Sequence, residues 1–129
     1  MTSTPTHALT WFEIPVRDLD RAQRFYEQVL QRPLAREAMG PRITLAGFPY
    51  AQGQGAGGCL KASADGAPAG HGTIVYLDAG PMLDAAAARV ADAGGRVVQP
   101  VHAIGPHGCR AVIVDSEGNR LALHSTGAP

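Results

Sequence analysis

The sequence has little cysteine, no net charge and no long apolar run. Its 129 residues include only two cysteines, Cys59 and Cys109, which are too few for a disulfide scaffold and lack zinc-ligand spacing. Eleven basic residues balance eleven acidic ones. No run of lysine or arginine offers the positive surface that nucleic acid or an anionic membrane requires. We therefore expect reduced thiols, no nucleic-acid partner and no membrane partner.

The chain also lacks an apolar stretch long enough to span a membrane. Its first residues, "MTSTPTH", do not form a basic region followed by an apolar segment, as a signal peptide would. We therefore expect a cytoplasmic protein. The hydrophobic fraction of 45% and the charged fraction of 17% favour a folded chain, and 129 residues normally build one core. A net charge near zero permits self-association.

The first part of the sequence predicts a strand, a helix and further strands. In residues 8–16, "ALTWFEIPV", apolar and other side chains alternate, which is typical of a strand with two different faces. Asp18 can cap a helix that runs to about Leu30, with apolar residues at helical spacing. Short strands follow at 42–48 and 57–62. The glycine-rich stretch between them lacks the GxGxxG order, so we expect no nucleotide site there.

The second part of the sequence repeats this pattern. A strand is predicted at 72–79, an alanine-rich helix at 81–95, and three strands at 96–100, 109–115 and 119–125. The segments "DLDRA" and "MLDAA" match at a separation of 64 residues. We therefore predict an α+β fold of one domain, in which two βαβββ modules form a cup-shaped mixed sheet. Module one covers about 8–62, a linker 63–70, and module two about 71–125.

Strand alternation places side chains on either the helix side or the cup side of this sheet. Trp11 and Glu13 are expected to face the cup, opposite the side that packs against the helix. In the last strand the leucines pack under a helix, while Arg120, Ala122 and His124 share the cup face.

Three segments carry a resemblance to a known family: "WFEIPVRDLDRAQRFYEQVLQRPL", "LDAAAARVADAGGRV" and "DSEGNRLALHS". With the duplicated βαβββ pattern, they resemble the vicinal oxygen chelate superfamily, which includes glyoxalase I, extradiol dioxygenases, and fosfomycin and bleomycin resistance proteins. The resemblance implies a cup-shaped sheet, a homodimer, and often a divalent metal. Such a metal is held by His, Gln or Glu side chains, one from the first and one from the last strand of each module.

The sequence departs from this ligand pattern. The first-strand position of module one, seven residues before Asp18, is Trp11, and the last-strand carboxylate position is Ala122. An indole nitrogen only donates and a methyl group has no lone pair, so neither side chain can bind a metal. The other two positions fall near Leu60 and Ile74. We therefore expect no cofactor and no metal at the usual site. A divalent metal would need a non-standard site, built from His71, Glu13 and His124.

The cup still offers groups for an organic ligand. The predicted ligand-binding residues are Trp11, Glu13, Tyr76, Arg110 and His124, because aromatic area with a few polar groups is typical of small-molecule sites. Glu13 and His124 are also the candidate catalytic acid and base. Two alternatives stay open: Trp11 can fill the cup as core, and Glu13 can form a salt bridge to Arg110 or Arg120.

Three other features have simple structural interpretations. The ring of Tyr26 is expected to pack at the edge of its helix. The turn "DSEGNR" suits a tight connection in which Asp115 accepts hydrogen bonds from turn amides. The segment 102–109, with His102 and His107, reads as a loop at the rim of the cup.

Three functions remain as hypotheses. The first is a glyoxalase- or bleomycin resistance-like protein that binds a small organic molecule in the cup without metal. The second is an enzyme, which the resemblance implies to be a lactoylglutathione lyase-related lyase or isomerase that uses Glu13 and His124 for proton transfer. The third is a metal-dependent enzyme with relocated ligands.

Overall fold

The structure is a computed structural model that describes residues 4–5, 7–51, 54–62 and 66–126. Within these ranges, no helix is both long enough and apolar enough to cross a membrane. The predicted linker 63–70 lies partly outside the described residues. Its described part contacts the second half of the chain, where Ala69 accepts a backbone hydrogen bond from Arg120.

The first half of the chain forms one helix and a four-stranded mixed sheet of order β1-β4-β3-β2. Strand β1 runs parallel to β4, and the other pairs are antiparallel. Asp18 caps the helix as predicted, since its carboxylate accepts from the Arg21 amide at 3.0 Å. The left-handed backbone of Gln31 (φ 54°) ends it. The elements are β1 (Trp11–Pro15), α1 (Leu19–Leu30), β2 (Ala35–Ala38), β3 (Thr44–Gly47) and β4 (Gly57–Lys61).

The second half repeats this plan in a sheet of order β5-β8-β7-β6, with β5 parallel to β8. Two short 3₁₀ turns, η1 and η2, interrupt it. The elements are β5 (Tyr76–Asp78), η1 (Gly80–Met82), α2 (Leu83–Arg89), β6 (Arg96–Ala103), η2 (Gly105–His107), β7 (Cys109–Val114) and β8 (Arg120–Ser125).

The predicted α+β fold with two βαβββ units is confirmed, and some element bounds differ. Strand β2 was not predicted, because its sequence "AREA" has exposed side chains and no apolar alternation. Helix α2 is shorter than the predicted 81–95, since Pro81 lies within a 3₁₀ turn and glycines follow soon after the helix. Strand β6 extends to Ala103, so His102 belongs to a strand and not to the predicted loop.

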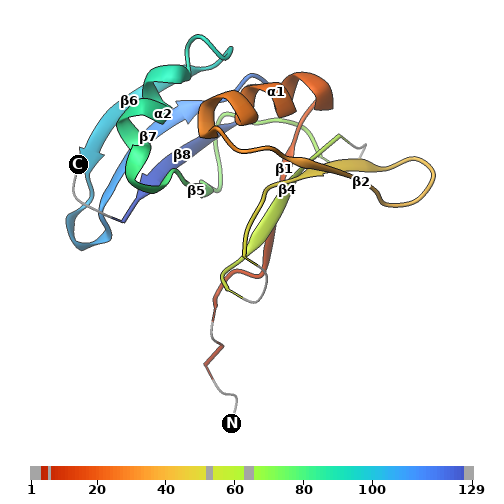
Figure 1. Cartoon of the computed structure of the whole chain (residues 1–129), viewed down its shortest axis with the longest axis horizontal. Coiled ribbons are helices and arrows are strands. Elements are labelled where there is room, and N and C mark those ends of the chain that lie inside the picture. Colours follow the sequence, from red (N-terminus) through yellow and green to blue (C-terminus); the bar gives the residue numbers. More distant parts are fainter. Residues whose placement is uncertain (1–3, 6, 52–53, 63–65, 127–129) are drawn as a thin grey trace.

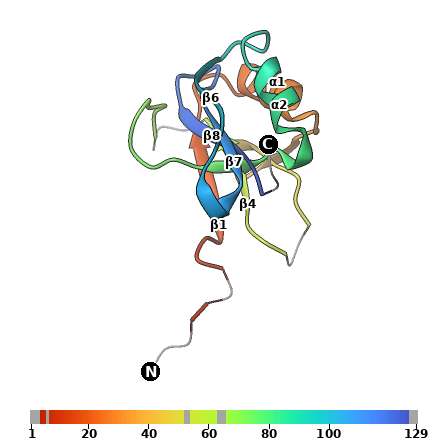
Figure 2. The ribbon, with the colours of Figure 1, turned by 90° about the vertical axis from the view of Figure 1, so that its left-hand side faces the viewer.

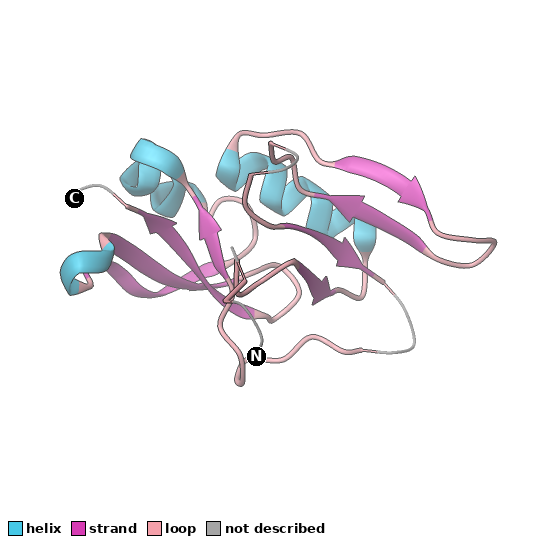
Figure 3. Ribbon diagram, turned by 90° about the horizontal axis from the view of Figure 1, so that it is seen from below, coloured by secondary structure: helices cyan, strands magenta, loops and turns pink. Residues whose placement is uncertain are grey.

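The internal repeat is also visible in the strand register. Trp11 pairs with Gly57 in the first sheet and Tyr76 pairs with Ala122 in the second, and both pairs are 46 residues apart. The two sheets lie side by side, with both helices on the same side of the molecule (Figures 1 and 3). Figure 2 shows the helices next to each other from a second direction.

One continuous apolar core joins the two halves. Ile14 and Val16 are buried and Phe12 packs against the core, as the alternation of the first strand predicted. Leu121 and Leu123 are buried under the helix side of the second sheet. On the opposite faces, Trp11, Glu13 and Tyr76 are exposed, whereas Cys59 and Ala122 are buried.

The turn between β7 and β8 ties the two halves together through Glu117. Its buried carboxylate accepts from the backbone amides of Arg17 and Asp18 at 2.9 Å and from two guanidinium nitrogens of Arg21 at 2.6 and 2.9 Å. Burial opposes ionisation, but these hydrogen bonds outweigh it and lower the pKa of Glu117 to about 2. The turn is therefore an ionic anchor as well as a tight connection.

Asp115 and Asn119 complete this anchor. Asp115 accepts from the amides of Glu117 and Asn119, as the sequence predicted, and also from the hydroxyl of buried Tyr26 at 2.6 Å. Burial and the adjacent carboxylate raise the pKa of Tyr26 well above its usual value, so the hydroxyl stays a donor. Asn119 donates to the carbonyl of Pro15 in the first half. Tyr26 therefore has a structural hydrogen bond in addition to its packing.

Candidate functional site

On the face of the first sheet away from the helix, Trp11 and Glu13 lie beside two residues of β4. Glu13 pairs in register with Cys59, and its carboxylate forms an ion pair with the Lys61 ammonium at 3.6 Å. Burial and the nearby Glu13 raise the pKa of the Cys59 thiol, which therefore stays protonated. The face combines an indole, an ion pair and an unreactive thiol.

The equivalent face of the second sheet carries a hydrogen-bonded network centred on Arg110. Its guanidinium donates to the Tyr76 hydroxyl at 2.6 Å, to Nε2 of His102 at 3.1 Å and to the Gln99 side chain at 3.4 Å. The ring of Tyr76 packs edge-on against His124, with centroids 5.5 Å apart. His124 in turn donates from Nε2 to the carbonyl of His107 at 2.6 Å. These contacts fix each polar group of the network.

The five predicted ligand-binding residues therefore form two clusters. Tyr76, Arg110 and His124 come together in the second half, whereas Trp11 and Glu13 lie in the first. The two structural alternatives predicted from the sequence, an ion pair of Glu13 with Arg110 or Arg120 and a core position for Trp11, are not found. The Glu13 carboxylate pairs with Lys61 and not with Arg110 or Arg120, and Trp11 is 44% exposed and does not fill a core.

The two candidate catalytic residues, Glu13 and His124, share no hydrogen bond, ion pair, ring contact or cavity among the described residues. His124 projects from β8 beside Asp78, its register partner in β5, whereas Glu13 is a residue of β1.

A cavity of about 760 Å³ lies between the halves, and we call it the interhalf cavity. Strand β1 of the first half forms one wall, and β5, β8 and the segment before β5 form the other. Its polar side chains include Glu13, Tyr76, His71 and Arg120. Apolar side chains supply most of the remaining wall, which is the usual composition of a small-molecule site. The apolar lining residues are Leu9, Phe12, Ile14, Pro15, Ala56, Ala67, Ala69, Ile74, Val75 and Leu121.

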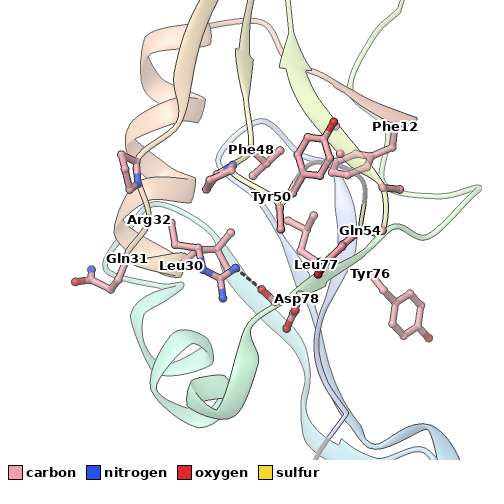
Figure 4. Close-up of a pocket in the computed structure, with 17 residues that line it drawn as sticks. Phe12, Leu30, Gln31, Arg32, Phe48, Tyr50, Gln54, Tyr76, Leu77 and Asp78 are labelled. Atoms are coloured by element: carbon pink, nitrogen blue, oxygen red, sulfur yellow. Dashed lines mark hydrogen bonds between the residues drawn. The ribbon is translucent and has the colours of Figure 1, made fainter. Parts of the chain in front are cut away.

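A second cavity, of about 790 Å³, lies by the end of α1 (Figure 4). Phe12, Phe48 and Tyr50 form its aromatic wall, and the Phe12 and Phe48 rings lie 5.6 Å apart. Arg32 at its edge donates to the backbone carbonyl of Asp78, so this cation already has a partner. The second cavity therefore combines an aromatic wall with polar side chains, among them Gln31, Gln54 and Asp78.

Two glycines make room for these aromatic rings. A Cβ atom on Gly57 would lie 2.2 Å from the Tyr50 ring, and a Cβ atom on Gly58 would lie 2.2 Å from the Phe12 ring. Both distances are far below van der Waals contact. From the sequence, the glycine-rich stretch was expected only to lack a nucleotide site, and Phe48 and Tyr50 were not predicted as site residues. Their place beside a glycine pair was the signal that could have indicated them.

The residues present do not fit the divalent metal that the resemblance implies. Trp11 and Ala122 lack a lone pair for it, and Ala122 is completely buried. Across the described ranges, no three His, Cys, Asp or Glu side chains come together as a ligand group. Glu13 and His71 line the same cavity, but His124, the third member of the suggested relocated set, does not.

Lys61 and Gln99 were not predicted as site residues either. Lys61 lies two residues after Cys59 in β4, so strand alternation could have placed it on the face of Glu13. Gln99 lies in β6 at a register irregularity, and no local pattern indicated its contact with Arg110.

These features define a class: an α+β protein of two βαβββ halves whose helices cover one side and whose sheets enclose cavities of small-molecule size. The comparison with family models specifies it further. Residues 8–123 match the Glyoxalase/Bleomycin resistance protein/Dioxygenase superfamily, and the chain belongs to this family. A comparison with curated proteins gives no match.

Solved structures agree on the fold. A glyoxalase/bleomycin resistance protein from Albidiferax ferrireducens T118 is 19% identical, with a TM-score of 0.67, over 92% of this chain and 98% of that one. A glyoxalase-related enzyme from Fulvimarina pelagi is 17% identical, with a TM-score of 0.64, over 91% and 86%. An E144Q mutant of glyoxalase I from Zea mays is 21% identical, with a TM-score of 0.65, over 92% of this chain and 46% of that one.

Proposed function

We propose that this protein binds a small organic molecule in the interhalf cavity and does so without a divalent metal. The observation that carries the proposal is the cavity itself, which is about 760 Å³ in volume and has side chains from both halves on its walls. Two predicted ligand-binding residues, Glu13 and Tyr76, line it. An apolar wall with a few polar groups can both hold and orient an organic ligand.

The donor chemistry supports the absence of metal from this function. An indole and a methyl group stand where the family would place ligands, and neither can replace a carboxylate or an imidazole. Binding energy must then come from apolar burial, hydrogen bonds and charge pairing within the cavity.

A cavity-filling variant tests this proposal. Ala69 lines the interhalf cavity and is exposed, so Ala69→Trp should place an indole in it without disturbing the core. Ala91→Trp, at an exposed position outside both cavities, is the matched control. A metabolite library is screened by ligand-observed NMR with a chelator present. We expect hits that bind wild type and the Ala91 variant and lose binding to the Ala69 variant. Hits that bind all three proteins equally would contradict the proposal.

Proton transfer at Glu13 is a second candidate, favoured by one observation. The Glu13 side chain lines the same cavity and is 48% exposed, so a bound substrate can reach its carboxylate. In this case Glu13→Gln should abolish turnover of a ligand found in the screen while leaving its affinity nearly unchanged. Unchanged turnover in the variant would exclude Glu13 as the base.

The homodimer and the cytoplasmic location stay predictions. Both sheet faces carry a half-exposed aromatic side chain, Trp11 in one half and Tyr76 in the other, which would suit contact with a second copy. Sedimentation velocity at several protein concentrations checks the dimer, and fractionation of expressing cells checks the location.

A further inference from the structure

Arg120 differs from the other arginines that the protein partly covers. Four arginines are half-buried. Arg32 and Arg89 donate to backbone carbonyls, and Arg110 donates to three side chains. Among the described residues, Arg120 donates from its side chain to no acceptor, and its Nε is fully covered by protein atoms. A covered donor without an acceptor destabilises the protein, because it has lost its hydrogen bonds to water.

The position of Arg120 connects this unmatched donor to the interhalf cavity. Arg120 begins β8 and lines the cavity together with its neighbours Asn119 and Leu121. Its backbone is fixed, because the Arg120 amide donates to the carbonyl of Ala69. The neighbouring Asn119 side chain is already bound to Pro15, Ala69 and Asp115. Arg120 therefore stands at the cavity wall on a rigid strand, with its guanidinium unmatched.

The other charges around the cavity leave a positive charge uncompensated. Glu13 is the only carboxylate among the described lining residues, and it forms its ion pair with Lys61. That pair is neutral, and among the described residues no carboxylate forms an ion pair with Arg120. Because Nε itself is covered, an anion in the cavity would pair with the terminal Nη groups of Arg120 and supply the missing counter-charge.

We infer that the interhalf cavity takes a small organic acid whose carboxylate is bound by Arg120. This inference rests on the proposed function and names the class of its ligand. A guanidinium presents parallel N–H groups that match the two oxygens of a carboxylate. The walls beside it are apolar, so the remainder of the ligand is an aliphatic or aromatic body. A single charge is favoured over a doubly charged phosphate, because one arginine lines the cavity and the Glu13 carboxylate lies in the opposite wall.

A matched pair of probes tests the inference on the wild-type protein. The acid is 4-phenylbutanoate and the neutral control is 4-phenylbutanamide, which has the same body without the charge. Affinities are measured by NMR titration at low and at moderate salt. We expect the acid to bind at least tenfold more tightly than the amide, with a difference that shrinks as salt rises. Equal affinities would overturn the inference, as would tighter binding of inorganic phosphate than of the acid.

Variants of Arg120 separate the charge from the shape. Arg120→Met keeps an apolar stem, and we expect it to remove the preference for the acid while leaving the affinity for the amide unchanged. Arg120→Lys should restore part of the preference for the acid, because it keeps the positive charge but lacks the parallel N–H groups of a guanidinium. Arg96→Met, at an exposed position outside both cavities, is the control and should preserve the full preference. An unchanged preference in the Arg120→Met protein would overturn the inference.

Stability gives a readout that does not depend on the ligand. Because the donor has no acceptor in the free protein, the melting temperature of the Arg120→Met protein should be equal to or above that of wild type. A marked fall would show that Arg120 has a structural partner and would contradict the inference.

The Ala69→Trp variant distinguishes the two proposals. If acid and amide bind equally and this variant blocks both, the cavity binds organic molecules and only the acid preference fails. If neither probe nor any library member binds at the cavity, both proposals fail.

Discussion

In the first half of the molecule, β4 begins with Gly57 and Gly58, whereas β8 of the second half has Ala122 and Leu123 at the equivalent register positions. The rings of Phe12 and Tyr50 fill the space above the glycines. In the second half, the side chains of the strand itself fill this space. The two halves share a backbone plan, but the second cavity lies beside the first sheet, whereas side chains fill the equivalent space in the second sheet.

The polar faces of the two halves differ as well. Trp11 and Tyr76 pair with equivalent positions and are both 44% exposed. Tyr76 is held by Arg110 within a network of hydrogen bonds, whereas the neighbours of Trp11 form a single ion pair of 3.6 Å. The second half is thus preorganised by polar contacts, and the first half depends on aromatic packing.

The largest expected effect on stability comes from removing the Glu117 carboxylate, which links the two halves. Glu117→Ala removes the acceptor of two backbone amides and of the Arg21 guanidinium. We expect the free energy of unfolding to fall by about 3 kcal/mol, since the loss of the buried carboxylate leaves two backbone amides without an acceptor, while half-exposed Arg21 can turn to water. Urea denaturation measures the change. Glu37→Ala, on an exposed strand, is the control and should change stability by less than about 0.5 kcal/mol. A loss as small as that of the control would contradict the anchoring role.

The same contact predicts a dependence on pH. The folded pKa of Glu117, about 2, lies below its ordinary value of 4.5. Its stabilising contribution is therefore complete above about pH 4.5 and is lost as the pH falls towards 2. The difference in unfolding free energy between wild type and Glu117→Gln should shrink over this window. A constant difference from pH 6 to pH 2 would rule out the carboxylate charge as its source.

The next effect tests the glycine pair of the first half. Gly58→Ala forces the partly buried Phe12 ring to move, and we expect a loss of about 2 kcal/mol. Gly57→Ala should cost less, because the opposing Tyr50 ring is exposed and free to turn away. Gly47→Ala in β3 is the control, since its added Cβ meets only a carbonyl oxygen at 3.7 Å. Thermal denaturation ranks the three variants, and equal losses would show that strand propensity, not the rings, sets the cost.

A smaller effect is expected at Tyr26, which joins helix α1 to the turn of the second half. Tyr26→Phe keeps the packed ring and removes the hydrogen bond to Asp115. We expect a loss of about 1.5 kcal/mol in urea denaturation, because the acceptor is charged and buried. Asp115 keeps its other donors, which limits the loss. No measurable change would mean that the ring alone accounts for the role of Tyr26.

The smallest effect concerns the polar network of the second half. Arg110→Met keeps the aliphatic stem and removes the hydrogen bonds to Tyr76, His102 and Gln99. We expect a loss of about 1 kcal/mol, because the network is partly exposed. Lys61→Met in the first half should cost less, since it breaks one long ion pair. If the Lys61 variant loses more stability than the Arg110 variant, the proposed contrast between the halves is wrong.

Much of the fold could be predicted because its signals are local. Asp18, the apolar spacing up to Leu30 and the repeat of "DLDRA" in "MLDAA" fixed the helices and the two-unit plan. Alternation correctly assigned the core side of β1 and β8. Strand β2 had no such signal, because its side chains are exposed and it is held by pairing with β3.

The site was harder to predict because it depends on contacts across the chain. Alternation brought Tyr76, Arg110 and His124 to one face, but it could not show that Arg110 bonds to Tyr76 or that Glu13 pairs with Lys61. These choices depend on which strands are neighbours and on their register. The unmatched Arg120 is likewise a property of the assembled cavity, since an arginine at a strand start is unremarkable in the sequence.

We propose that a cavity between the two halves binds its ligand without a metal. Elemental mass spectrometry tests it most directly, on protein purified without a metal-affinity tag and again after titration with nickel, zinc, manganese and iron. We predict far less than one metal ion per chain in both samples, with ligand binding unchanged by a chelator. Near-stoichiometric metal, with ligand binding lost on chelation, would contradict metal-free binding.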